Sequence, residues 1–148
     1  MIRAATLAMM CLPAAAQAQQ YLPCDDYRSS AFALAEPWTD FTDTYAQGAV
    51  RLAITDTGEP AAGSYYLLVL WPSADESEGR QCTLISFDDS LGFAGLSLVG
   101  AAVSGDLTSG LIITLPARRW MPATDTYKDA SLTVTVDQAA GTVTAVLH

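Results

Sequence analysis

Apolar and polar residues alternate along most of the chain after residue 48, and this period of two is typical of β-strands with one buried face. The first such segment places Val50, Leu52 and Ile54 on one face, with polar or small residues between them. Residues 65–71 are apolar on both faces, which indicates a central strand covered on each side. Further strands are predicted at residues 82–87, 95–104, 111–115, 132–136 and 142–147.

Two turns of the same form separate these segments. Residues 106–110 and 137–141 both consist of Asp, three residues and Gly. Asp favours the start of a type I turn, and Gly tolerates the left-handed conformation from which the next strand begins. Gly100 interrupts its own apolar segment and predicts a bend or bulge there. About seven mostly antiparallel strands at this spacing predict an all-β domain over residues 48–148, either a single β-sandwich or a small barrel.

Residues 19–47 lack this alternation and predict an N-terminal arm that is irregular or short-helical. The pair of aspartates that ends at Asp26 suits the cap of a short helix over residues 27–35. Aromatic residues recur every three or four positions from Trp38 to Tyr45, which suits either a helix or aromatic plugs on an irregular arm.

The first 18 residues have the three parts of a secretory signal peptide. A basic start at Arg3 precedes an apolar stretch, and Ala16-Gln17-Ala18 has the small-x-small pattern of a cleavage site. The apolar stretch is too short to anchor the chain across a bilayer core of about 30 Å; the alternative is a buried N-terminal helix. We expect cleavage after Ala18, a location in the periplasm or outside the cell, and no membrane span in the mature chain.

Export also changes the interpretation of the cysteines. Cys11 falls in the predicted signal, which leaves Cys24 and Cys82 as an even number in an oxidising compartment. We therefore predict a Cys24–Cys82 disulfide, with two free buried thiols as the alternative. Two cysteines without an internal histidine cannot complete the four ligands of a zinc site.

The charge balance argues against several classes of partner. Sixteen carboxylates face seven basic residues, which gives a net charge of −9. Binding to nucleic acid or to anionic lipid needs clustered Lys and Arg, so neither partner is expected. The single histidine is His148, which removes most mechanisms that rely on an internal imidazole. No cofactor is predicted.

Asp56-Thr57-Gly58 resembles the catalytic string of aspartic proteases, in which two Asp-Thr-Gly loops follow apolar strands and their aspartates share a proton. This chain has one copy, so activity would require a homodimer. Thr55 and Glu59 stand where that family usually has an apolar and a small residue. The string is also an ordinary turn sequence.

Two other groups have simpler interpretations than catalysis or metal binding. Residues 95–100 resemble a serine nucleophile elbow only superficially, because the spacing after Ser97 is one residue too long. Acidic residues at 75–78 and 88–89 lack the ordered spacing of a calcium loop and are typical of solvated loops. We predict no catalytic residue and no metal site.

Arg118, Arg119 and Trp120 form the strongest candidate for contact with a partner. They lie near the start of a predicted long connection between two strands, and long loops on a rigid sheet often carry function. Arg and Trp are also enriched at binding hot spots. The alternative is that Trp120 covers the core while the arginines pair with the acidic surplus.

The sequence is thus most consistent with an exported, non-enzymatic β-domain that binds an envelope protein or a glycan. One alternative is a homodimeric aspartic protease that uses Asp56. Another is a purely structural module without a specific site.

Overall fold

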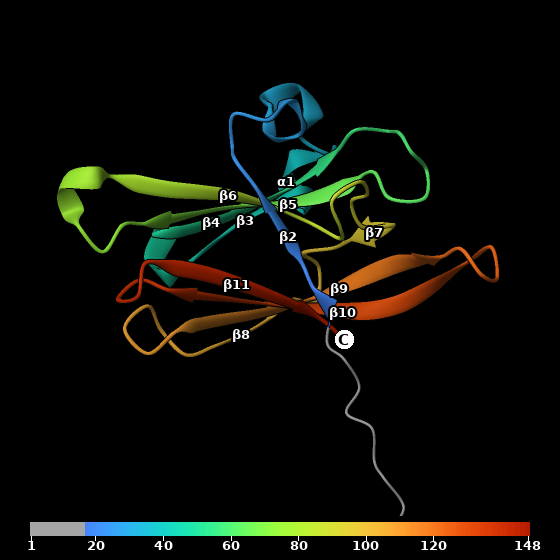
Figure 1. Cartoon of the computed structure of the whole chain (residues 1–148). Coiled ribbons are helices and arrows are strands. Elements are labelled where there is room, and N and C mark those ends of the chain that lie inside the picture. Colours follow the sequence, from blue (N-terminus) through green and yellow to red (C-terminus); the bar gives the residue numbers. More distant parts are fainter. Residues whose placement is uncertain (1–16) are drawn as a thin grey trace, which may run out of the picture.

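The computed structural model describes residues 17–148 and shows two antiparallel β-sheets packed face to face (Figure 1). The first sheet contains β1 (Gln17–Ala18), β7 (Gly95–Leu96), β8 (Ala102–Ser104), β9 (Leu111–Met121), β10 (Thr126–Asp137) and β11 (Thr142–Leu147). The second contains β2 (Gln20–Leu22), β3 (Thr42–Tyr45), β4 (Val50–Asp56), β5 (Tyr65–Pro72) and β6 (Arg80–Ser86). The helical elements are one α-helical turn, α1 (Trp38–Phe41), and the 3-10 turns η1 (Tyr27–Ser29), η2 (Ala31–Ala33), η3 (Ala46–Gly48) and η4 (Glu76–Glu78).

The strand order makes β9 and β10 the centre of the first sheet and β5 the centre of the second. The orders are β1-β11-β10-β9-β7 and β2-β6-β5-β4-β3. Both β7 and β8 pair with β9, on the edge that β10 leaves free. The predicted all-β sandwich of mostly antiparallel strands is confirmed, and so is the short-helical character of the arm.

The inner faces of the two sheets form one hydrophobic core. Alternate residues of β9 from Leu111 to Ala117 are buried, and their neighbours face outward. Leu67 in β5 and Val134 in β10 are completely buried. Burial of apolar area stabilises the fold by roughly 25 cal/mol per Å². Apolar residues therefore occupy every second position of these strands, and this period of two is the pattern that predicts them from the sequence.

Both Asp-to-Gly turns have the predicted geometry. Asp106 Oδ1 accepts the backbone N–H groups of Thr108 and Ser109 at 2.8 Å each, and Asp137 Oδ1 accepts that of Ala140 at 2.9 Å. The glycines that end the two turns have φ angles of 97° and 65°, in the left-handed region. The side-chain hydrogen bond from Thr108 and the other donors lower the pKa of Asp106 to about 2.

The prediction of a long connection after residue 115 is wrong. The chain does not leave the sheet at Pro116, because β9 continues to Met121 and pairs with β10 along its whole length. The carbonyl of Pro116 accepts the N–H of Ser97, on the side away from β10. The proline nitrogen lies on that same side, so its missing N–H removes no bond from the β9–β10 ladder.

The N-terminal arm crosses from one sheet to the other (Figure 1). Residues 20–22 of the arm pair with β6 in the second sheet, whereas Gln17 and Ala18, the last two residues of the predicted signal peptide, pair with β11 in the first. The Tyr21 hydroxyl also accepts the backbone N–H of Ala145 at 2.7 Å. Residues 1–16 of the predicted signal peptide lie outside the described part of the chain, and the signal stays a prediction.

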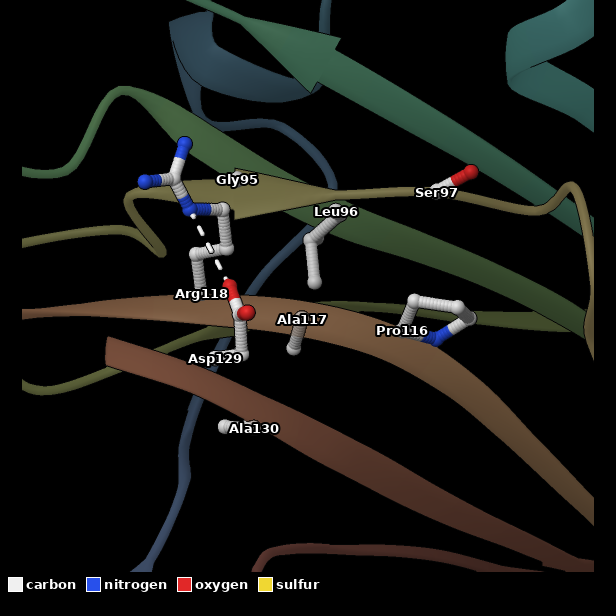
Figure 2. A pocket seen from close by; sticks show the side chains of 8 residues that line it. All are labelled: Gly95, Leu96, Ser97, Pro116, Ala117, Arg118, Asp129 and Ala130. Atoms are coloured by element: carbon white, nitrogen blue, oxygen red, sulfur yellow. Dashed lines mark ion pairs between the residues drawn. The ribbon is translucent and has the colours of Figure 1, made fainter. Parts of the chain in front are cut away.

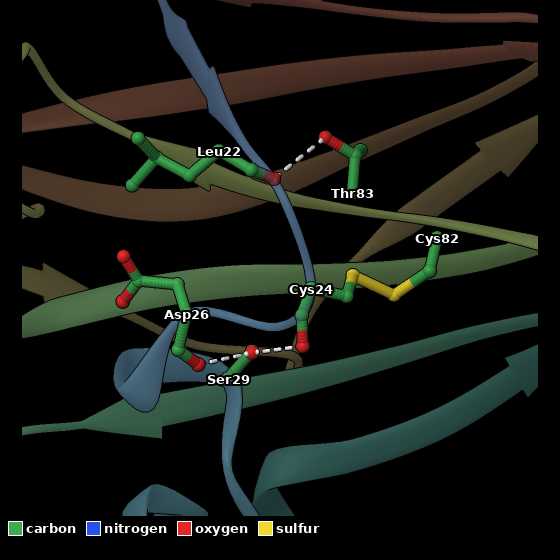
Figure 3. The surroundings of a disulfide bond; sticks show 6 residues. All are labelled: Leu22, Cys24, Asp26, Ser29, Cys82 and Thr83. Atoms are coloured by element: carbon green, nitrogen blue, oxygen red, sulfur yellow. Dashed lines mark hydrogen bonds between the residues drawn. A yellow bond between two sulfur atoms is a disulfide. The ribbon is translucent and has the colours of Figure 1, made fainter.

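The predicted disulfide between Cys24 and Cys82 is confirmed (Figure 3). It joins the arm just after β2 to the strand β6, with a Cα–Cα distance of 6.0 Å. Beside it, the Ser29 hydroxyl donates to the Cys24 carbonyl at 2.7 Å, and that of Thr83 donates to the Leu22 carbonyl at 3.4 Å. The covalent bond therefore fixes a segment that is otherwise held by a few hydrogen bonds.

Asp26 and Arg28 form an ion pair on the arm that predicts a pH dependence of stability. Arg28 donates from Nε and Nη2 to the two carboxylate oxygens of Asp26, at 2.7 Å each. These bonds lower the pKa of Asp26 to about 2. Because the unfolded value is about 3.9, this contribution to stability is complete above that pH and is lost as the pH falls towards 2.

We expect Asp26→Asn to lose less of its unfolding free energy between pH 4 and pH 2 than the parent protein, as measured by urea denaturation at each pH. Other carboxylates with lowered pKa values, such as Asp106, are present in both proteins, so the difference isolates Asp26. Equal pH slopes for the two proteins would show that the pair does not couple to folding.

Candidate binding site on the β9–β10 hairpin

The register of β9 and β10 gathers four side chains on the outer face of the first sheet. Trp120 is directly opposite Tyr127, and Arg118 is directly opposite Asp129. These positions alternate with the buried Ala117, so their side chains point away from the core. The site is therefore a cross-strand cluster on a regular hairpin.

The four side chains contact one another while remaining accessible. The Arg118 guanidinium lies 5.0 Å from the centroid of the Tyr127 ring, within the range of a cation–π interaction. The rings of Trp120 and Tyr127 are 5.0 Å apart with a 57° tilt. Arg118 Nε lies 3.5 Å from Asp129 Oδ1, and the two side chains are 53% and 95% exposed. An ion pair this exposed contributes little to stability, so both groups are available to a ligand.

A pocket of about 410 Å³ adjoins this cluster where β7 runs beside β9 (Figure 2). Figure 2 shows Arg118 and Asp129 at one end of the pocket and Ser97 and Pro116 at the other. The remaining lining residues are small or apolar: Gly95, Leu96, Ala117 and Ala130. A largely apolar hollow with a few polar groups, of this size, is typical of a ligand-binding site.

Gly95 shapes the pocket end that holds Arg118. A Cβ atom at Gly95 would lie 3.5 Å from Cβ and Cδ of Arg118, which is an ordinary van der Waals distance. Glycine thus leaves room beside the Arg118 stem, and alanine at this position would narrow the pocket without a backbone clash.

The structure separates the three residues that were grouped from the sequence. Arg118 and Trp120 share the outer face, whereas Arg119 points to the opposite face and is paired in register with Lys128. Tyr127 and Asp129 join the cluster, although neither is among the site residues predicted from the sequence. Continued alternation through Pro116 is the signal that would have placed them opposite Trp120 and Arg118.

The hairpin is also tied to a neighbouring loop. The Tyr127 hydroxyl donates to the carbonyl of Ala61 at 3.3 Å, in the connection between β4 and β5. This bond fixes the Tyr127 ring from the far end, so the aromatic surface is partly pre-organised. Pre-organised side chains lose less conformational entropy when a ligand binds.

Asp56 has a local structural role at the end of β4. Its Oδ1 accepts the backbone N–H of Gly58 at 2.8 Å, and the N–H of Thr57 donates to the Ser64 carbonyl at 3.1 Å. Burial raises the pKa of the neighbouring Tyr65 hydroxyl, and the Asp56 charge adds to this effect. Asp-Thr-Gly thus forms an Asx-type turn here, and the homodimeric protease stays an untested hypothesis.

The carboxylates of the acidic loops accept hydrogen bonds from the backbone of the same loops. Asp75 accepts the N–H of Ser77, and Asp88 accepts those of Ser90 and Leu91. Within residues 17–148, no group of three or more His, Cys, Asp or Glu side chains is placed to hold a metal ion. Over the same residues, the helices are all too short or too polar to cross a membrane.

Comparisons with known proteins identify no relative. No family model matches the chain, and no curated protein or solved structure matches it either.

Proposed function

We propose that the chain is an exported, non-enzymatic binding module that uses the β9–β10 hairpin and its pocket to hold an envelope component. The observation that carries the proposal is the cluster of Arg118, Trp120, Tyr127 and Asp129 beside a pocket of about 410 Å³. None of these four side chains belongs to the buried core. Arg, Trp and Tyr are the residues most enriched at binding hot spots.

Two further features support an extracytoplasmic binding role. The Cys24–Cys82 disulfide fits an oxidising compartment. Most of the site lies where the β9–β10 hairpin extends past its pairing with β11, and the hydrogen bond from Tyr127 to Ala61 ties this part to the connection between β4 and β5. Recognition needs only such placement of polar and aromatic groups, without a nucleophile or a base.

The proposal is tested by photo-crosslinking in the intact cell envelope. A crosslinking amino acid at position 129 faces the site, and one at position 128 faces the other side of the same hairpin. We expect a defined product from position 129 and little from position 128. Equal yields from the two positions would contradict a site on the outer face.

Trp120→Ala should reduce the crosslinked product from position 129 by about 30-fold, because a hot-spot residue contributes about 2 kcal/mol. Arg119→Ala is the matched control, since it removes a neighbouring cation on the opposite face. Thermal unfolding of both variants should stay close to that of the parent. A large loss of stability in Trp120→Ala would assign that ring to the fold instead.

A further inference from the structure

The strand β1 belongs to the first sheet, although the sequence assigns its two residues to the signal peptide. Gln17 is paired with Leu147 and Ala18 with Val146, antiparallel to β11. The other edge of β11 pairs with β10. β1 is therefore the outermost strand of this sheet, and cleavage after Ala18 would remove it from the exported protein.

The alternation of the antiparallel ladder shows which backbone groups of β11 depend on β1. Ser131 and His148 exchange both backbone hydrogen bonds, at 2.9 Å and 3.2 Å, so the groups of His148 are directed towards β10. Neighbouring residues of a strand direct their N–H and C=O groups to opposite sides. Those of Leu147 are therefore directed towards Gln17, its partner in register.

Two segments of the arm thus satisfy the outer edge of β11. The Tyr21 hydroxyl accepts the N–H of Ala145 at 2.7 Å, and Gln17 is the partner of Leu147. Leu147 is 7% exposed, and a buried backbone group without a partner costs about as much free energy as a lost hydrogen bond. A chain that began at Gln19 would leave the N–H and C=O of Leu147 without this partner.

The burial of Gln19 is a second argument against a chain that begins there. Gln19 is 2% exposed and lies where the arm passes from the first sheet to the second. Cleavage after Ala18 would convert its peptide nitrogen into an α-amino group, which is mostly protonated and charged at pH 7. Transfer of a charged group out of water is costly. An intact β1 keeps this nitrogen in a neutral peptide bond.

The sequence contains a second cleavage pattern two residues earlier. Ala14-Ala15-Ala16 has the same small-x-small form as Ala16-Gln17-Ala18. Cleavage after Ala16 would still remove the basic start and the apolar stretch of the signal, and it would leave β1 whole.

We propose that signal peptidase hydrolyses the peptide bond between Ala16 and Gln17, and that β1 is the first strand of the exported domain. Water supplies the hydroxyl of the new carboxyl group on Ala16 and a proton to the new amino group of Gln17. The proposal depends on export and is independent of the binding site on the β9–β10 hairpin. It moves the cleavage that is expected from the sequence by two residues.

The cleavage position is measured by expressing the full precursor in a bacterium that exports it and sequencing the N-terminal peptide by tandem mass spectrometry. We expect Gln17 to be the first residue. A product that begins at Gln19, or at any other residue, would overturn the proposal. An uncleaved precursor would overturn the export of the chain as well.

Two matched substitutions identify the alanines that the peptidase recognises. Ala14 belongs to the proposed site alone, and Ala18 belongs to the later site alone. Ala14→Tyr should abolish the product that begins at Gln17, whereas Ala18→Tyr should leave the cleavage position unchanged. The reverse result would assign the cleavage to the later site.

Hydrogen exchange, followed by NMR, tests whether β1 is part of the exported fold. In a chain that begins at Gln19, the Leu147 amide should exchange about tenfold faster than in a chain that begins at Gln17, because it loses its partner. The Val146 amide is the control, since the alternation directs it towards β10 and its protection should be equal in both chains. Equal exchange of Leu147 in the two chains would exclude β1 from the fold.

Discussion

Phe93→Ala is expected to lower the free energy of unfolding by about 4 kcal/mol, because a large aromatic side chain would be removed from the core. Phe93 is completely buried and lies edge-on to Phe87, with ring centroids 6.2 Å apart. Its backbone N–H and carbonyl both bond to Tyr65, at 2.7 Å and 3.1 Å. The ring thus fills the core where the chain passes from the second sheet to the first, and alanine would leave a cavity.

Urea denaturation followed by tryptophan fluorescence measures this loss. Phe32→Ala is the matched control, because Phe32 is fully exposed and the same substitution there should change stability by less than about 0.5 kcal/mol. Similar losses for the two variants would show that burial of Phe93 does not govern its contribution.

Removal of the disulfide is expected to cost about 4 kcal/mol in the chain-entropy model. The bond joins residues separated by 58 positions, so a long loop becomes free in the unfolded chain when it is absent. The double variant Cys24→Ser/Cys82→Ser keeps the Ser29 and Thr83 hydrogen bonds, which hold the arm less firmly than a covalent bond. Denaturation with and without reductant measures the effect.

The double variant supplies the internal control for this prediction. Reductant should shift the unfolding midpoint of the parent to that of the double variant and leave the double variant unchanged. A parent protein whose midpoint does not respond to complete reduction would contradict the predicted contribution.

The strands that were predicted from strict alternation, such as β4 and β9, are those with one buried face. Val50, Leu52 and Ile54 all lie in the core, and the same is true of Leu111, Ile113 and Leu115. The strands β2 and β3 gave no such signal, because they are short edge strands that are exposed along most of their length. Their pairing depends on β6 and β4, which no local pattern encodes.

The candidate site was predicted only in part for a related reason. Composition singled out Arg118, Arg119 and Trp120, but the direction of each side chain depends on whether the strand continues past Pro116. Proline is tolerated there because its nitrogen faces away from β10, and this is a property of the pairing. The register places Tyr127 and Asp129 in the cluster. It also places Arg119 on the opposite face, so that Arg119→Ala serves as the control for Trp120→Ala.

The hydrogen bond from the Ala145 N–H to the Tyr21 hydroxyl affects the order in which the chain folds. These residues are 124 positions apart, and the segment that contains Tyr21 holds both sheets at once. Contacts of such long range slow folding, because a long loop must close before they form. The arm can complete its pairing only after β11 has been synthesised. During synthesis, the chain would therefore remain incompletely closed until its last strand is available.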